Sequence, residues 1–231
     1  MNFLDTFVVL DTCVLLKQRV SDVLMDLRSE KVFSAYWTEN IDEEFLRNMQ
    51  EVYELSETRA LNRLRAMKAR CPEWEVFMTS EDFSAVPEEV DPKDRHVAAA
   101  ALALRHAVDQ DAQDDEPGQT YDVILVTDNI RDLAKKQMAK LGVRVMRSGA
   151  FLNDVYKAEP DAATRAVLQA AKDLKIPPYT VPELLYALRE QGAKTLAAKM
   201  AKVLGVTPVA KEPADGSKVG AKGTRAVARA K

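Results

Sequence analysis

The chain is poor in the residues that build disulfide frameworks and membrane spans. Its two cysteines, Cys13 and Cys71, cannot form a disulfide framework and do not stand at metal-ligand spacing. The longest uninterrupted apolar run, Val97–Leu104, is far shorter than the roughly 20 residues that a helix needs to cross a bilayer. Met1–Thr6 has neither the basic start nor the apolar stretch of a signal peptide. We therefore expect a cytoplasmic protein with reduced thiols and no membrane contact.

Charge of one sign does not dominate, and histidine is scarce. The formal net charge is −3, with 33 Lys and Arg against 36 Asp and Glu, so the chain as a whole is no polycation. A nucleic acid would have to be held by a local basic patch or by metal ions. Of the two histidines, we interpret His96 as a packing or hydrogen-bonding residue rather than a metal ligand.

Apolar strands alternate with amphipathic helices over the first two thirds of the chain. The helix that begins after Asp91 has the clearest start, because Asp91 is a good cap and Pro92 occupies the first helical position. Strands separated by helices predict an α/β fold with a parallel sheet covered on both faces. The expected strands are Phe7–Leu10, Val32–Trp37, Glu75–Thr79, Val123–Val126 and Val143–Met146.

From Asp161 the strands stop and three helices are expected. Thr180 and Glu183 form a capping box before the second of them. Their apolar residues are too many to leave in water, so these helices should pack on the preceding domain or on a second copy of the chain. The helices are Asp161–Leu174, Leu184–Gln191 and Ala193–Leu204.

Two charged segments have little apolar content. Residues 109–118, DQDAQDDEPG, are interpreted as a solvated acidic loop, with a docking site for a basic partner as the alternative. Val206–Lys231 has six Lys or Arg and two Asp or Glu, and we expect it to be disordered. Its basic character leaves weak RNA attraction as an alternative to a solubilising role. The predicted division is therefore residues 1–158, a helical extension at 159–205, and a basic tail at 206–231.

Polar residues stand directly after two of the predicted strands. Asp11 follows the first strand, and Thr127, Asp128 and Asn129 follow the fourth. In open parallel sheets, ligands bind at the carboxyl ends of the strands, so these side chains are expected to face one crevice. Asp11 capping the turn after its strand is the alternative interpretation.

Two further carboxylates stand on helices that lead to the same crevice. Glu44 lies six residues after Thr38, where a helix is expected to start, and Asp94 lies in the first turn of the helix opened by Asp91. The apolar residues that follow Asp94 must face the sheet, which places the start of that helix beside the crevice. Glu44 on a solvated helix face, and Asp94 as a favourable charge at a helix N-terminus, are the alternatives.

Four motifs, in this order and spacing, resemble the PIN-domain family, and more narrowly the VapC-like PIN proteins of bacterial toxin–antitoxin systems. They are Val9–Leu15, Thr38–Glu44, Asp94–Ala100 and Val126–Leu133, and the similarity extends over about residues 5–158. The resemblance implies a PIN-like three-layer α/β/α sandwich with a central parallel sheet, here followed by the C-terminal helical extension.

The resemblance also implies acidic residues that bind Mg²⁺ or Mn²⁺ and cleave RNA. Asp11, Glu44 and Asp94 match the first three acids of the family. Mg²⁺ is a hard ion that prefers carboxylate oxygens, and clustered carboxylates stay ionised together only with a cation between them. A bound metal lowers the pKa of a water and neutralises charge on the phosphate, so no Ser, Cys or His nucleophile is required.

The fourth position of the acidic set is open. Asn129 stands two residues after Thr127, which matches the hydroxyl residue of the family motif in type and place. Asp128 and Asp132 are acidic neighbours that could serve instead, although an aspartate in the position of Asp128 is more often a turn residue than a ligand. Candidates for holding a substrate phosphate are Thr127, Arg95 and Arg131, with a solvated surface role as the alternative for the two arginines.

The resemblance further implies RNA as the substrate, a cognate antitoxin as a possible protein partner, and a homodimer. We therefore predict a metal-dependent endoribonuclease, the toxin of a type II toxin–antitoxin pair. The alternative is a catalytically weak or inactive PIN-fold module that binds RNA or protein. A phosphatase-like hydrolase with Asp11 as nucleophile ranks lower, because that class typically has a second Asp where this chain has Cys13.

Overall fold

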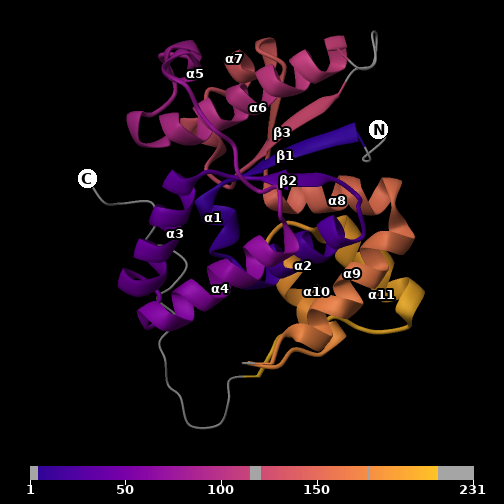
Figure 1. The fold of residues 1–231 in the computed structure, drawn as a ribbon. Coiled ribbons are helices and arrows are strands. Elements are labelled where there is room, and N and C mark those ends of the chain that lie inside the picture. The colour runs from indigo at the N-terminus through magenta and orange to yellow at the C-terminus, as the bar shows by residue number, and fades with distance from the viewer. Residues whose placement is uncertain (1–4, 115–120, 176, 213–231) are drawn as a thin grey trace.

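A computed structural model describes residues 5–114, 121–175 and 177–212, and its centre is one parallel sheet (Figure 1). The strand order is β2-β1-β3-β4. Leu10 stands opposite Val126, and Val126 opposite Met146, so three of the strands end side by side. The strands are β1 (Thr6–Leu10), β2 (Ser34–Tyr36), β3 (Asp122–Val126) and β4 (Val143–Met146).

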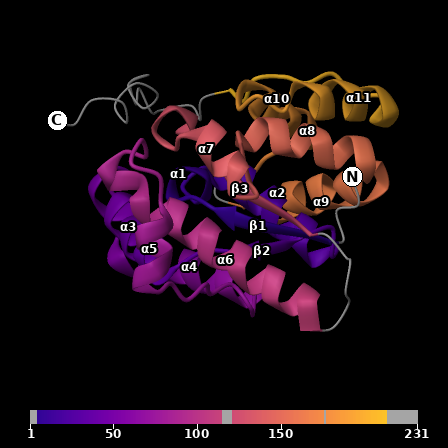
Figure 2. The same ribbon diagram turned by 90° about the horizontal axis from the view of Figure 1, so that it is seen from above.

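Helices cover both faces of the sheet, which explains the almost continuous apolar character of β1 and β3. Figures 1 and 2 show α6 (Arg95–Asp114) and α7 (Lys135–Lys140) on one face. The opposite face carries α2 (Gln18–Ser29), α8 (Ser148–Ala158) and α9 (Pro160–Asp173). The predicted α/β/α sandwich with a parallel sheet is thereby confirmed.

The long helix α6 packs on the sheet through small side chains. Ala98, Ala99, Ala100 and Ala101 are all fully buried, and the helix contacts β1, β3 and β4. Alanine lets the helix approach the strands closely without leaving voids. As predicted, the Asp91 carboxylate caps its entry by accepting a 3.1 Å hydrogen bond from the Lys93 amide.

Six further elements within the described residues surround this core. The segment after β1 forms a single helical turn, and the segments before and after α6 include two 3₁₀ turns. These elements are α1 (Thr12–Leu15), α3 (Glu39–Glu51), α4 (Glu57–Arg70), α5 (Ser80–Ala85), η2 (Pro92–Asp94) and η3 (Ile130–Asp132).

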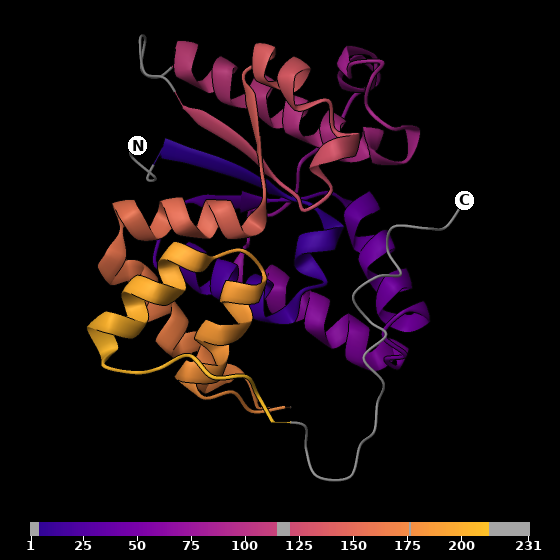
Figure 3. The ribbon, with the colours of Figure 1, turned by 180° about the vertical axis from the view of Figure 1, so that it is seen from behind.

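The C-terminal helices pack on the same domain. Figure 3 shows α10 (Val181–Glu190) and α11 (Lys194–Leu204) outside α8 and α9. Their predicted apolar side is buried, with Leu184, Leu188 and Leu196 fully covered. Of the two arrangements expected for these helices, the structure therefore shows packing within the chain, with α9 against α2 and α11 against α8.

The start of the basic tail is also held against these helices, contrary to the expected disorder. The Val206 amide donates to Ala201 O (3.0 Å), and the Val209 amide donates to Pro182 O (3.3 Å). The remainder of the tail, residues 213–231, lies outside the described residues. Over the part of the chain that is described, none of the helices has the length and apolar character needed to span a membrane.

Two local predictions were wrong. Residues 75–79 form no strand, and only an isolated bridge joins Glu75 to Trp37. Phe77 in this segment is 80% exposed, so the apolar run does not contribute a buried strand. The loop expected from Asp109 begins later, because α6 continues to Asp114; residues 115–118 of that loop lie outside the described residues.

Candidate functional site

The candidate site lies where two neighbouring strands end. From β1 the chain leads to β2 on one side, and β3 lies on the other side of β1, so this is where the winding of the sheet changes direction. The Asp11 amide donates to Val126 O (3.1 Å) and the Thr127 amide donates to Met146 O (2.9 Å), which continues the ladders by one residue. Such switch points are the usual ligand sites of open α/β sheets.

Asp11 is the most enclosed carboxylate of the site. It is 6% exposed, and its Oδ2 accepts hydrogen bonds from the Thr127 hydroxyl (2.6 Å) and the Cys13 thiol (2.9 Å). Burial raises the pKa of Asp11, these two hydrogen bonds act against that rise, and the nearby charge of Glu44 adds to it. Asp11 is thus oriented by two neutral donors rather than by a cation of the chain.

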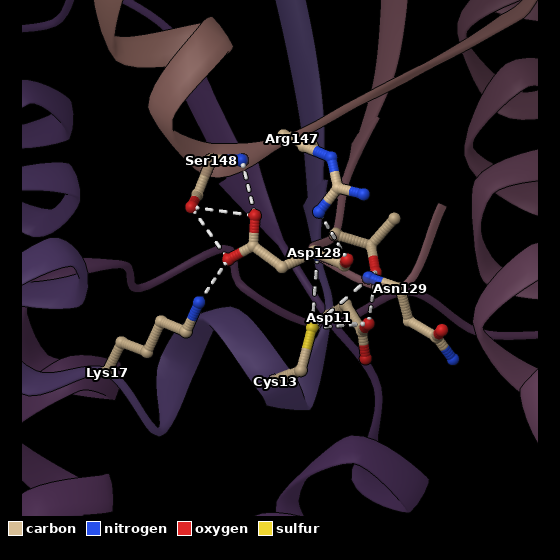
Figure 4. A network of polar contacts seen from close by, with 8 residues as sticks. Asp11, Cys13, Lys17, Asp128, Asn129, Arg147 and Ser148 are labelled. Atoms are coloured by element: carbon tan, nitrogen blue, oxygen red, sulfur yellow. Dashed lines mark hydrogen bonds and ion pairs between the residues drawn. The ribbon is translucent and has the colours of Figure 1, made fainter. Parts of the chain in front are cut away.

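A chain of hydrogen bonds leads from Asp11 to Asp94. The Thr127 hydroxyl accepts from the Asn129 amide (2.9 Å), and the Asn129 side-chain nitrogen donates to Asp94 Oδ2 (2.9 Å). Burial, followed by the charge of Asp11, raises the pKa of Asp94 to about 7. The polar residues after β3 therefore connect an acid after β1 with an acid at the start of α6, and Figure 4 shows Asp11 and Asn129 side by side.

Glu44 reaches the same region from α3. Its Oε2 accepts a 2.8 Å hydrogen bond from the Thr12 hydroxyl and lies 3.5 Å from His96 Nε2. The contact with His96 is the main cause that lowers the pKa of Glu44. Glu43, by contrast, is exposed, so of these two neighbouring residues it is Glu44 whose side chain faces the crevice.

Asp128 follows the same strand as Thr127, but its side chain turns away from Asp11 (Figure 4). Its carboxylate accepts hydrogen bonds from Lys17 Nζ (2.6 Å), the Ser148 amide (3.1 Å) and the Ser148 hydroxyl (2.8 Å to Oδ2). Asp132 pairs with Lys93 at 3.1 Å, which lowers the pKa of Asp132. The structure therefore brings Asn129, rather than either aspartate, to the three acids.

The two predicted phosphate-binding arginines are placed differently. The Arg95 guanidinium donates to the carbonyl oxygens of Phe83 (3.1 Å), Val86 (3.2 Å) and Pro87 (3.2 Å), and so holds the end of α5. Arg131 is exposed on η3. Arg95 is thus occupied by a structural role, whereas the Arg131 side chain is accessible to a ligand.

The three acids suit a hard divalent cation in their chemistry. They offer carboxylate oxygens, and the negative charges of Glu44 and Asp11 raise the pKa of Asp11 and Asp94, respectively. Such repulsion between carboxylates is relieved when a cation lies between them. Within the described residues, however, no three His, Cys, Asp or Glu side chains are gathered closely enough to form a complete metal site. Asp11, Glu44 and Asp94 are the residues that would hold an ion here.

Three neighbours of the site were not predicted to act in it. Thr12 and Cys13 directly follow Asp11, and because the chain makes one helical turn there, they contact Glu44 and Asp11. Their position directly after Asp11 in the first motif could have indicated this role. His96, interpreted from the sequence as a hydrogen-bonding residue, has its ring beside Glu44. Cys71 is buried in the core.

Comparison with known proteins points to one family. Residues 149–202, which comprise most of α8, all of α9 and α10 and most of α11, match the family described as the VapC50 C-terminal domain. Neither the search of curated proteins nor that of solved structures returned a significant match. The matched segment begins next to Ser148, whose amide and hydroxyl contact Asp128.

Proposed function

We propose, on the premise that this chain is a VapC-like PIN protein with a VapC50 C-terminal domain, that it is a metal-dependent endoribonuclease and the toxin of a type II toxin–antitoxin pair. One observation carries the proposal. Hydrogen bonds join Asp11, Thr127, Asn129 and Asp94 into one chain at the switch point of the sheet. Glu44 joins the group from α3, where its negative charge is near enough to raise the pKa of Asp11.

The acids and the residues beside them have distinct roles in this proposal. Asp11, Glu44 and Asp94 hold Mg²⁺ or Mn²⁺, and Asn129 completes the set, since its amide nitrogen binds Asp94 while its amide oxygen is a further hard ligand. When bound, the ion stabilises negative charge on the phosphate and acidifies a water molecule. The chain supplies the orientation, since Thr127 and Cys13 fix the Asp11 carboxylate and Thr12 fixes Glu44.

The partners follow from the same premise. The substrate is RNA, and the protein partner is a cognate antitoxin, which would be encoded by a short reading frame upstream of this gene for a small DNA-binding protein. A homodimer is also part of the proposal. The described C-terminal helices cover their apolar sides within the chain, so a dimer would have to use another surface. Light scattering after size exclusion distinguishes it from a 25.7 kDa monomer.

Cleavage of RNA by the purified chain tests the activity. Labelled single-stranded RNA is incubated with Mg²⁺, with Mn²⁺, and with either ion plus EDTA, and calorimetric titration with Mn²⁺ measures binding of the ion alone. We expect cleavage with either ion and its loss in EDTA. Cleavage that persists in EDTA would contradict the metal site. Metal binding without cleavage would favour the alternative of a PIN-fold module that binds RNA or protein.

A further inference from the structure

Two basic side chains stand at the same edge of the sheet as the acids. Lys17 lies between α1 and α2, and Arg147 follows β4 as the residue before α8. Both contact Asp128, directly after Thr127, as Figure 4 shows. They come from segments that are far apart in the sequence, and Asp128 brings them together.

Asp128 makes hydrogen bonds through its carboxylate, its backbone amide and its carbonyl oxygen. Its carboxylate accepts from Lys17 and from the amide and hydroxyl of Ser148, and its backbone amide donates to Cys13 Sγ (3.2 Å). Its carbonyl oxygen accepts a 2.9 Å hydrogen bond from Arg147 Nη1. Cys13 in turn donates to Asp11. Hydrogen bonds through Asp128 and Cys13 therefore connect the two cations to the acid site.

The two cations retain capacity for a ligand. Lys17 and Arg147 against Asp128 leave one net positive charge in the group. An ammonium has three N–H donors and a guanidinium five, and Asp128 takes one from each. The Lys17 side chain is 33% exposed, and Arg147 is exposed. Arginine and lysine donors, together with a helix N-terminus, are the groups that most often bind nucleic-acid phosphates.

We infer that Lys17 and Arg147 form a binding subsite for an RNA phosphate next to the one that is cleaved, with Asp128 as the positioning residue that holds both cations. This inference rests on the proposed ribonuclease function and assigns the subsite that places the strand on the acids. Without a bound ion the acids repel RNA, and cationic side chains beside them attract the backbone to this edge of the sheet. Arg95, which is occupied by three carbonyl oxygens, does not offer that contact.

Binding of RNA without cleavage tests the inference. Anisotropy of a fluorescein-labelled single-stranded RNA is measured in EDTA between 50 and 200 mM salt, with the full chain and the variants Lys17→Met, Arg147→Gln and Arg147→Lys. The control is Arg165→Ala, an exposed arginine on α9 that pairs with Glu30. Thermal melting verifies that each variant is folded.

We expect Lys17→Met and Arg147→Gln each to weaken binding about 3- to 10-fold, and to lower the slope of log K against log salt by roughly 0.7, as for one lost contact to a single strand. Arg147→Lys should keep most of the affinity, and Arg165→Ala all of it. Folded variants that bind like wild type, an equal loss in Arg165→Ala, or no binding by wild type in EDTA would each overturn the subsite. The cleavage assay judges the proposed function separately, because binding that depends on these cations without any cleavage would refute only the catalytic proposal.

Discussion

Thr127 Oγ1 lies 2.6 Å from Asp11 Oδ2 and donates a hydrogen bond to it, although the two residues are 116 positions apart in the sequence. The same hydroxyl accepts from the Asn129 amide. Asp11 directly follows β1 and Thr127 directly follows β3, so the register of these two parallel strands fixes the contact between them. One hydroxyl thereby sets the orientation of the first acid and of the turn that carries Asn129.

Replacing Thr127 by valine should therefore weaken metal binding and cleavage without unfolding the chain. The shape is kept, but the Asn129 amide loses its acceptor, at a cost of about 1–3 kcal/mol. The pKa of Asp11 should rise further, because the Thr127 hydrogen bond lowers it. We expect a loss of roughly 10- to 100-fold in kcat/KM, or about 1.4–2.7 kcal/mol. Thr127→Ser should restore most of the activity, and an equally impaired serine variant would contradict a role for the hydroxyl.

The two acids at the ends of the hydrogen-bond chain are each expected to be essential. Asp11→Asn and Asp94→Asn remove a charge from the metal site with little change in volume, so cleavage should fall by about 10³-fold or more while the melting temperature stays close to wild type. Calorimetric titration with Mn²⁺ should show weaker binding. Asp154→Asn, at a surface residue of α8 paired with Lys157, is the control. Wild-type activity in both site variants would refute the metal-site assignment.

Glu44→Gln and Glu43→Gln should behave differently although the residues are adjacent. Neighbouring helical residues point about 100° apart. Only Glu44 contacts Thr12 and His96, whereas Glu43 is exposed. We expect Glu44→Gln to lower both the affinity for Mn²⁺ and the cleavage rate about 10-fold or more, and Glu43→Gln to change either by less than about 2-fold. The reverse pattern would show that Glu44 does not face the metal.

The sequence predicted the fold where the signal is local. The apolar runs of β1 and β3 and the cap at Asp91 depend on neighbouring residues, and the structure has each of them. Residues 75–79 were predicted as a strand because their apolar residues resemble one, whereas Phe77 is exposed in the structure. Local composition does not show whether a partner strand is within reach.

The candidate site divides in the same way. The positions of Asp11 and Asn129 could be predicted, because each residue follows closely after an apolar run that the sequence shows to be a strand. The contacts of Asp128 join residues 111 positions away at Lys17 and 20 positions away at Ser148. No pattern within a single segment indicates such pairs, because only the packing of α1 and α8 on the sheet edge creates them.

Asp26 should make the stability of the chain depend on pH. It is 5% exposed, and Arg70 Nη1 donates to its Oδ1 at 2.8 Å. Burial, only partly offset by the charge of Arg70, raises the pKa of Asp26 from 3.8 to about 6. The ionised form is thus disfavoured in the folded chain, so the free energy of unfolding should fall as the pH rises from about 4 to about 6 and this effect should level off above.

Melting temperatures of wild type and Asp26→Asn between pH 4 and pH 7.5 measure this effect. Asparagine keeps an oxygen for Arg70 but does not ionise. The difference between variant and wild type should therefore move in favour of the variant across pH 4–6 and then stay constant. A difference that does not change with pH would show that Asp26 has an ordinary pKa.

Packing within residues 149–202, of α8 against the turn before α11, depends on one glycine. A Cβ at Gly149, in the first turn of α8, would lie 2.4 Å from Gln191 O and 2.4 Å from the carbonyl carbon of Gly192, both backbone atoms of the turn before α11. Backbone cannot give way as a flexible side chain can, so Gly149→Ala must push α8 and that turn apart. We expect it to lower the free energy of unfolding by about 3 kcal/mol, as overpacking does. The control, Gly205→Ala, has nothing within 4 Å and only the strain of φ +64°, which costs about 1 kcal/mol. Urea unfolding measures both, and a Gly149→Ala variant at least as stable as Gly205→Ala would show that α8 does not approach this turn so closely.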